Sequence, residues 1–109
     1  MKRYAVAVVG ATGLVGRKML QVLEEHRFPV GEIRLLASAR SAGRTVTFAR
    51  KHEPVLELTP DSFEGVDVAL FSAGATVSRE YAPHAVRAGT LVVDNSSAFR
   101  LDPGVPLVV

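Results

Sequence analysis

The sequence predicts an α/β fold in which helices cover both faces of a doubly wound, mostly parallel sheet. Residues 4–9 are apolar from Ala5 to Val9, which is typical of a strand that is buried on both faces. Behind this strand, apolar residues recur at helical spacing: Val15, Met19, Val22 and Leu23. Further strands and helices alternate along the chain, and such alternation favours a parallel sheet.

Length and composition limit the class of protein. The 109 residues suit one domain, and 48% hydrophobic with 22% charged residues are typical of a globular chain. No apolar run approaches the roughly 20 residues of a membrane span, so we expect a cytoplasmic protein with no membrane partner. The formal charge of +2 is small and the basic residues are scattered, which disfavours nucleic acid as a partner.

The types of residue that are missing also exclude some chemistry. There is no cysteine, so these residues hold no disulfide, no thiolate metal site and no cysteine nucleophile. The three histidines are far apart in sequence, and none has a partner at metal-ligand spacing, so we expect no metal. Residues 105–109 look like the opening of another buried strand, and we therefore expect the chain to be a fragment of a longer protein.

A glycine-rich turn, GATGLVG, follows the first strand and leads into the helix. We expect Gly10 to take the tight turn, Gly13 to let a pyrophosphate approach the backbone, and Gly16 to allow close packing of helix on strand. The N–H groups of the first helical turn and the helix dipole then favour an anion on Gly13 and Leu14. This pattern predicts a Rossmann-type dinucleotide-binding domain, and the alternative is a glycine-rich turn without a ligand.

The other strands are predicted from apolar runs between turn residues. Pro29 and Gly31 make a connection into the second strand, and a basic turn separates two lesser strands in the middle of the chain. We expect these strands at 32–37, 45–48, 55–58, 66–71 and 91–93.

Two further helices are predicted from capping patterns. Thr59 as N-cap and Pro60 at the first helical position predict a helix of about one turn. Thr76 as N-cap predicts a helix to residue 88, with Gly89 just past its end and with Pro83 kinking or restarting it. The expected buried face of this helix carries Val77, Tyr81 and Ala85.

In a doubly wound sheet, ligands bind beyond the carboxyl ends of the strands. An NAD-specific domain carries an Asp or Glu after its second strand to hold the ribose 2′-hydroxyl, but this chain has Ser38, Ala39, Arg40 and Ser41 there. Two hydroxyls and a guanidinium suit a 2′-phosphate, so we predict NADP rather than NAD. The alternative is an ordinary solvated arginine in a turn.

Two later loops also follow predicted strands. Ser72, Ala73 and Gly74 are small enough for a ribose or nicotinamide to approach the backbone, although they are equally typical of a turn. Asn95, with the two serines after it, and Arg100 could bind an oxyanion; the alternative is a helix cap followed by a surface arginine.

Four motifs together give the chain a family resemblance: GATGLVG, SARSAG, FSAG and DNSSAFR. Over essentially all 109 residues the chain resembles the N-terminal part of aspartate-β-semialdehyde dehydrogenase. The resemblance implies NADP-dependent reductive dephosphorylation of L-aspartyl 4-phosphate to L-aspartate 4-semialdehyde, on the route to lysine, methionine and threonine. Two alternatives stay open: a stand-alone NADP-binding module without catalysis, and an N-acetyl-γ-glutamyl-phosphate reductase.

The resemblance also implies roles for particular residues. By similarity, the cofactor's pyrophosphate lies on Gly10, Thr12, Gly13, Leu14 and Val15. Its 2′-phosphate is held by Ser38, Arg40 and Ser41, and its ribose and nicotinamide lie along Ser72, Ala73 and Gly74. Arg100 matches the family's phosphate-binding arginine, and Asn95 lies in the loop that faces the active site.

The family's catalytic cysteine and its histidine partner have no counterpart in this chain, so residues 1–109 are expected to be an NADP-binding domain that is inactive alone. The second domain of the family supplies most of the substrate site and the interface of a homodimer. Ala75 departs from the family, in which a second glycine is expected after Gly74.

Overall fold

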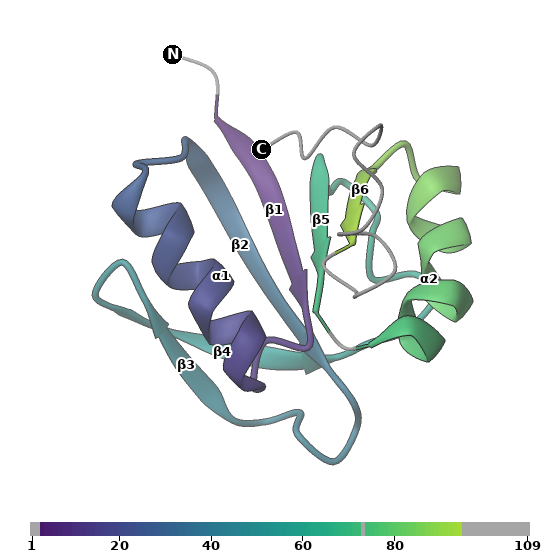
Figure 1. Cartoon of the computed structure of the whole chain (residues 1–109), viewed down its shortest axis with the longest axis horizontal. Coiled ribbons are helices and arrows are strands. Elements are labelled where there is room, and N and C mark those ends of the chain that lie inside the picture. The colour runs from purple at the N-terminus through teal and green to yellow at the C-terminus, as the bar shows by residue number, and fades with distance from the viewer. Residues whose placement is uncertain (1–2, 73, 95–109) are drawn as a thin grey trace.

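A computed structural model of the chain describes residues 3–72 and 74–94, and it confirms the doubly wound, mostly parallel sheet (Figure 1). The six strands lie in the order β3-β4-β2-β1-β5-β6, and all neighbours are parallel except β3 and β4. The strands are β1 (Tyr4–Val9), β2 (Val30–Ala37), β3 (Thr45–Phe48), β4 (Lys51–Glu57), β5 (Val68–Phe71) and β6 (Leu91–Asp94). The helices are α1 (Leu14–Glu25) and α2 (Ala75–Arg87).

The central strand β1 is buried on both faces, as its apolar sequence predicted. Val6 and Val8 belong to the core beneath α1, together with Leu20 and Leu23 of that helix. Ala7 and Val9 belong to the core on the opposite face, where α2 lies beside β5 and β6 (Figure 1). The two cores hold β1 in the middle of the sheet, so its carboxyl end is a fixed point for the site.

The predicted buried face of α1 is partly wrong. Val15 and Val22 are 44% and 37% exposed, whereas the buried positions are Gly16, Leu20 and Leu23. The cause is the contact at Gly16, where an added Cβ would lie 2.2 Å from the Gly10 carbonyl oxygen. Because this contact brings Gly16 onto the end of β1, it fixes the rotation of the helix and carries Leu20, one turn later, onto the sheet.

The predicted start of α2 is also wrong, while its end is confirmed. The helix begins at Ala75 with Gly74 as N-cap, not Thr76, and it continues through Pro83 without a restart. At the other end Gly89 has φ +82°, and its N–H donates to the Val86 carbonyl at 3.0 Å while the Thr90 N–H donates to Ala85 at 2.9 Å. This pair of bonds is a Schellman motif, for which a glycine at this position is well suited.

The helix predicted at Thr59 and Pro60 is absent from the described residues, where a series of turns connects β4 to β5. The Thr59 N–H donates to the Ser62 hydroxyl at 2.8 Å and the Ser62 N–H donates to the Thr59 carbonyl at 3.0 Å, so the two residues close a turn on each other. Phe63, which is fully buried, anchors the connection by stacking on Phe71 with ring centroids 5.8 Å apart. Burial of Phe63 by the sheet replaces the helix as the feature that orders the segment.

The strands at residues 4–9 and 45–48 have their predicted bounds, and the other four differ from prediction by one to four residues. β2 starts at Val30 instead of residue 32, β5 starts at Val68 instead of residue 66, and β6 extends to Asp94. The largest difference is in β4, which begins at Lys51 because it pairs antiparallel with β3 before it joins β2. This hairpin supplies pairing partners to residues 51–54, whose polar sequence gave no strand signal.

The two turn residues of the β3–β4 hairpin have a backbone conformation that their residue types rarely adopt. Phe48 pairs with Lys51, and between them Ala49 and Arg50 have φ angles of +52° and +67°. Two positive φ angles are typical of a type I′ turn, which prefers Asn–Gly. The double substitution Ala49→Asn, Arg50→Gly is therefore expected to raise the free energy of unfolding by about 1 kcal/mol in urea denaturation. A loss of stability would show that the Ala49 and Arg50 side chains stabilise the fold by more than the strain of their positive φ angles destabilises it.

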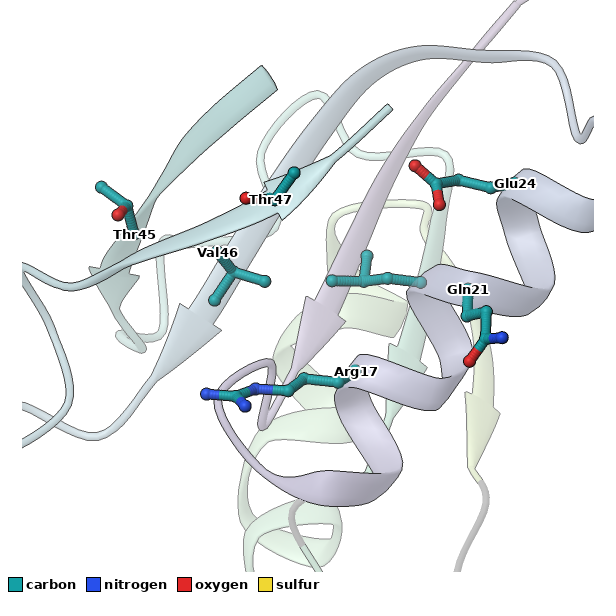
Figure 2. Close-up of a pocket in the computed structure, with 7 residues that line it drawn as sticks. Arg17, Gln21, Glu24, Thr45, Val46 and Thr47 are labelled. Carbon is teal, nitrogen blue, oxygen red and sulfur yellow. The ribbon is translucent and has the colours of Figure 1, made fainter. Parts of the chain in front are cut away.

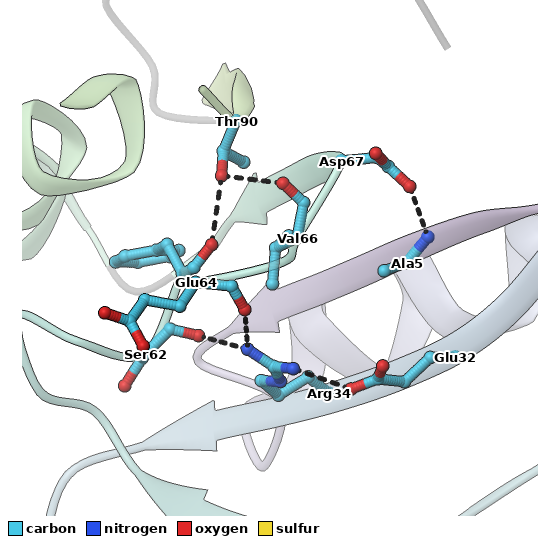
Figure 3. A network of polar contacts seen from close by, with 9 residues as sticks. Ala5, Glu32, Arg34, Ser62, Glu64, Val66, Asp67 and Thr90 are labelled. Carbon is cyan, nitrogen blue, oxygen red and sulfur yellow. Dashed lines mark hydrogen bonds and ion pairs between the residues drawn. The ribbon is translucent and has the colours of Figure 1, made fainter. Parts of the chain in front are cut away.

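Arg34 of β2 ties the β4–β5 connection to the sheet (Figure 3). Its guanidinium donates to the carbonyls of Ser62 at 2.7 Å and Glu64 at 2.9 Å, and it pairs with Glu32 at 2.7 Å. Thr90, before β6, donates from its hydroxyl to the Val66 carbonyl at 2.8 Å. These bonds hold the residues on both sides of Phe63 in place.

Replacing Arg34 by Met is expected to lower the free energy of unfolding by about 1–3 kcal/mol, because two carbonyls lose a charged donor. Arg34→Lys is the matched control, since an ammonium keeps the charge but lacks the forked geometry. We expect Lys to recover part of the loss in urea denaturation followed by circular dichroism. Equal stability of Arg34→Met and the wild type would contradict the assigned role.

Candidate functional site

A cavity of about 540 Å³ lies where the carboxyl ends of β1, β2, β4 and β5 meet. Six of the predicted cofactor residues line it: Gly10, Thr12, Gly13, Ser38, Ser41 and Ser72. Parallel strands direct their carboxyl ends to one edge of the sheet, which is why residues as distant in sequence as Gly10 and Ser72 converge here. The cavity is the structure's candidate for a dinucleotide site.

The glycine turn is attached to β2 and brings α1 close to the end of β1. Gly10 has φ +86°, and its N–H donates to the Leu36 carbonyl at 2.8 Å, as does that of Ala11 at 3.2 Å. The Gly13 N–H is itself used, donating to the Gly10 carbonyl at 3.0 Å. Of the two residues predicted to bind an anion, Gly13 therefore has its N–H in use, and the N–H groups without an intrahelical partner begin at Leu14, in the first turn of α1.

The start of α1 suits an anion. Gly13 is the N-cap, no side chain caps the helix, and the first turn contains no acidic residue. The first-turn N–H groups of a helix have no intrahelical partner, and the helix dipole makes this end positive. The Gly16 contact with Gly10 leaves no room for a side chain and brings these donors to the edge of the sheet.

The loop after β2 presents two serines to the cavity. The Ser38 carbonyl accepts hydrogen bonds from the Ser41 N–H at 2.9 Å and the Ala42 N–H at 3.0 Å, which folds residues 38–42 into a compact turn. Ser38 and Ser41 line the cavity, together with Ala37 and Ala39. Arg40 is exposed and does not line it, so it stands beside the two serines on the solvent side.

The loop after β5 joins the ends of two strands. The Ser72 hydroxyl donates to the Val9 carbonyl at 2.8 Å, and the Ser72 N–H donates to the same oxygen at 2.9 Å. Ser72 therefore fixes β5 to β1, and it also lines the cavity. Gly74 has φ +100° and is the N-cap of α2, so a glycine is needed there for backbone reasons whether or not a ligand binds.

Sequence reasoning missed the far wall of the cavity. Glu57 and Leu58 come from the end of β4, and Val77 and Tyr81 come from α2. The predicted helical face of α2 already grouped Val77 with Tyr81, but as core residues. Only the pairing of β4 with β2, in which Glu57 lies opposite Ala37, reveals that the end of β4 reaches the site.

The remaining predicted residues are not brought into the cavity lining. Leu14 and Val15 lie on the outer side of α1, and Leu14 is 86% exposed. Gly74 is exposed at the start of α2 and does not line the cavity either. Ala73, Asn95 and Arg100 lie outside the described residues.

A second cavity, of about 310 Å³, lies between α1 and the edge strand β3 (Figure 2). Its lining includes Arg17, Gln21 and Glu24 of the helix and Thr45, Val46 and Thr47 of the strand. None of the predicted cofactor residues lines this cavity, and it lacks a helix start or a glycine turn. The cavity at the carboxyl ends of the strands is therefore the better candidate of these two for a dinucleotide.

Comparison with known proteins assigns a family. The family model described as "Semialdehyde dehydrogenase, NAD binding domain" matches residues 5–109. The chain belongs to this family. The resemblance seen in GATGLVG, SARSAG, FSAG and DNSSAFR is thus confirmed, and the family is one of nicotinamide-dinucleotide-binding domains.

Curated relatives are aspartate-semialdehyde dehydrogenases. The protein of that name from Aquifex aeolicus is 56% identical over 107 residues, which are 97% of this chain and 32% of that protein. The one from Bacillus subtilis is 56% identical over 104 residues, 95% of this chain and 30% of that protein. The chain thus spans about a third of the length of these relatives.

Solved structures agree with this assignment. Aspartate semialdehyde dehydrogenase II from Vibrio cholerae, complexed with ASA, has 47% identity and a TM-score of 0.83, covering 99% of this chain and 35% of that one. The Candida albicans enzyme, solved with NADP, has 31% identity and a TM-score of 0.72, covering 99% and 34%. A Rex-family repressor, at 17% identity and a TM-score of 0.68, shares the fold alone.

Among the helices of the described residues, neither is long and apolar enough to cross a membrane.

Proposed function

We propose that this chain is the NADP-binding part of a longer enzyme that reduces L-aspartyl 4-phosphate to L-aspartate 4-semialdehyde. The observation that carries the proposal is the cavity in which an uncapped helix start and the Ser38–Ser41 turn face the same space. The names of the curated relatives, aspartate-semialdehyde dehydrogenases, support the semialdehyde as the compound on which the whole enzyme acts.

The residues of the cavity fit an NADP molecule in size and in donor chemistry. A volume of about 540 Å³ falls in the range typical of cofactor sites. The first-turn N–H groups of α1 bind the pyrophosphate, and the close approach of Gly16 to Gly10 places them there. The absence of a side chain on Gly13 keeps the path to these groups open.

The loop after β2 selects the phosphorylated ribose. Ser38 and Ser41 donate hydroxyl hydrogen bonds to the 2′-phosphate, and the exposed Arg40 side chain folds over it to donate charge-assisted bonds. Residues 38–41 occupy the place where an NAD-specific domain has a carboxylate, and they contain none, so no negative charge at that point repels the phosphate.

When bound in this cavity, NADPH would supply the hydride for the reduction. Residues of this chain orient the cofactor for that transfer: Ser72 fixes the end of β5 against β1, and Gly74 turns the chain into α2 beside the nicotinamide ribose. Asn95 and Arg100 are proposed to bind the substrate phosphate, and Ala73 to contact the nicotinamide ribose. The nucleophile is supplied by the rest of the proposed enzyme, because these residues contain no cysteine.

Two other functions remain as alternatives. A stand-alone NADP-binding module would be encoded by a gene that ends near this sequence, and an N-acetyl-γ-glutamyl-phosphate reductase would prefer N-acetylglutamyl phosphate to aspartyl phosphate. Assays of the complete gene product with both acyl phosphates separate the three. The cytoplasmic location and the homodimer expected from the sequence stay predictions.

Titration of the chain with NADP⁺ and NAD⁺ by calorimetry tests the cofactor assignment. The wild type is expected to prefer NADP⁺, and Arg40→Ala is expected to weaken NADP⁺ binding about 10-fold while leaving NAD⁺ binding unchanged. Arg44→Ala is the matched control, since Arg44 is an exposed arginine of the same loop that does not line the cavity. Equal losses for both cofactors in Arg40→Ala would contradict the assignment.

A further inference from the structure

Glu57 is the one charged side chain among the described residues that line the 540 Å³ cavity. It is exposed at the last position of β4, and its carboxylate makes no hydrogen bond or ion pair with the described residues. A carboxylate in a cavity that takes a polyanion must face a part of the ligand that carries hydrogen-bond donors. The position of Glu57 along the sheet edge indicates which part that is.

The strand ends at the cavity follow one another in the order β1, β2, β4. The glycine turn ends β1 and faces the pyrophosphate, and the Ser38–Ser41 turn ends β2 and faces the phosphorylated ribose, if the proposed function holds. Glu57 lies directly opposite Ala37 in the parallel register, one strand farther from the glycine turn. Neighbouring strands are about 4.8 Å apart, so the next group of the cofactor, the adenine, lies over the end of β4.

The neighbours of Glu57 in the cavity suit a flat aromatic ring. Leu58 follows it in sequence, and Tyr81 and Val77 approach from α2. These three side chains are partly buried and pack against the core on the α2 face, so they form a fixed apolar wall. The flat face of a purine can pack against such a wall, and the polar edge of the purine is then available to a polar side chain.

We propose that the Glu57 carboxylate accepts a hydrogen bond from the exocyclic 6-amino group of the cofactor's adenine, and so makes the site selective for that base. In NADP the 2′-oxygen of the adenosine ribose is phosphorylated and is no longer a hydroxyl donor. On the adenine ring, the 6-amino group is the hydrogen-bond donor. This assignment rests on the proposed function, because it takes the cavity to be the NADP site.

The test compares NADP⁺ with its analogue in which unsubstituted purine replaces adenine, so that the 6-amino group alone is lost. By calorimetry, the wild-type chain is expected to bind NADP⁺ about 10-fold more tightly than the analogue. Glu57→Leu is expected to bring the two affinities within about twofold of each other, and Glu57→Gln, which keeps an acceptor oxygen, is expected to retain part of the difference.

Glu53→Leu is the matched control, because Glu53 lies on the same strand and does not line the cavity. It is expected to keep the wild-type preference, and thermal unfolding checks that each variant is folded. Equal binding of NADP⁺ and the analogue by the wild type overturns the inference about Glu57 but not the NADP site. A Glu57→Leu variant that changes the NADP⁺ to NAD⁺ ratio and keeps the purine preference places Glu57 at the ribose and also overturns it. Failure of the wild type to bind either NADP⁺ or NAD⁺ overturns the proposed function itself.

Discussion

Gly16→Ala is expected to destabilise the chain strongly. The added Cβ would lie 2.2 Å from the Gly10 carbonyl oxygen and 2.9 Å from the Ala11 Cα, and both neighbours are backbone atoms that cannot rotate away. The start of α1 would have to move off β1, which opens the core around Leu20. We expect a loss of about 3–5 kcal/mol in the free energy of unfolding, measured by urea denaturation, out of the roughly 5–15 kcal/mol of a typical domain.

Gly13→Ala is the matched control for this prediction, three residues away in the same turn. Its Cβ would lie 3.5 Å from the Gly10 carbonyl oxygen, an ordinary contact, and Gly13 has φ −79°, which alanine adopts without strain. The variant should therefore keep its stability within about 1 kcal/mol. Its methyl group faces the cavity, so dinucleotide affinity is expected to fall roughly 10-fold. Wild-type stability in Gly16→Ala would show that the helix does not need this close approach.

The parts of the fold that the sequence predicted depend on local signals. The strand at residues 4–9 was found at its observed bounds because a continuous apolar run needs no partner to be recognised. Gly89 was found because a helix C-terminus selects a positive φ at one position. The turn at Gly10 was found because a positive φ angle there also favours glycine.

The parts that the sequence did not predict depend on contacts between distant residues. The sequence of α1 offers two overlapping apolar stripes, one with Val15 and Val22 and one with Leu20, and the Gly16 contact with β1 selects the second. Thr59 and Pro60 match a helix start, but burial of Phe63 and the bonds from Arg34 hold the segment as turns. Where a tertiary contact of this kind exists, it determines the local structure more strongly than the local sequence pattern does.

The residues of the candidate site also fall into those that local sequence predicts and those that depend on contacts between distant residues. Gly10, Ser38 and Ser72 follow strands that are evident from sequence, and the cavity contains all three. Glu57 and Tyr81 were missed as site residues because one depends on the register of β4 against β2 and the other on the packing of α2. Neither relationship has a signal within a short window of sequence.

Ser38→Asp is expected to invert the cofactor preference. Ser38 is the first residue after β2 and lines the cavity, so the substitution puts a carboxylate where NAD-specific domains have one. A carboxylate there repels a 2′-phosphate and accepts a hydrogen bond from a ribose 2′-hydroxyl, whereas a serine hydroxyl is able to donate to a phosphate. We expect the affinity for NADP⁺ to fall about 100-fold and that for NAD⁺ to rise several-fold in calorimetric titrations.

The turn itself should tolerate this change. The contribution of Ser38 to the turn comes from its backbone carbonyl, which accepts from the Ser41 and Ala42 N–H groups, and Asp is a favoured residue at the first position of such turns. Ser38→Asn is the control of equal size without charge, and it should reduce NADP⁺ affinity much less than Asp. If Asp weakens both cofactors to the same extent, the ribose does not lie against the end of β2. If Asn and Asp have the same effect, the loss comes from side-chain size and not from repulsion of a phosphate.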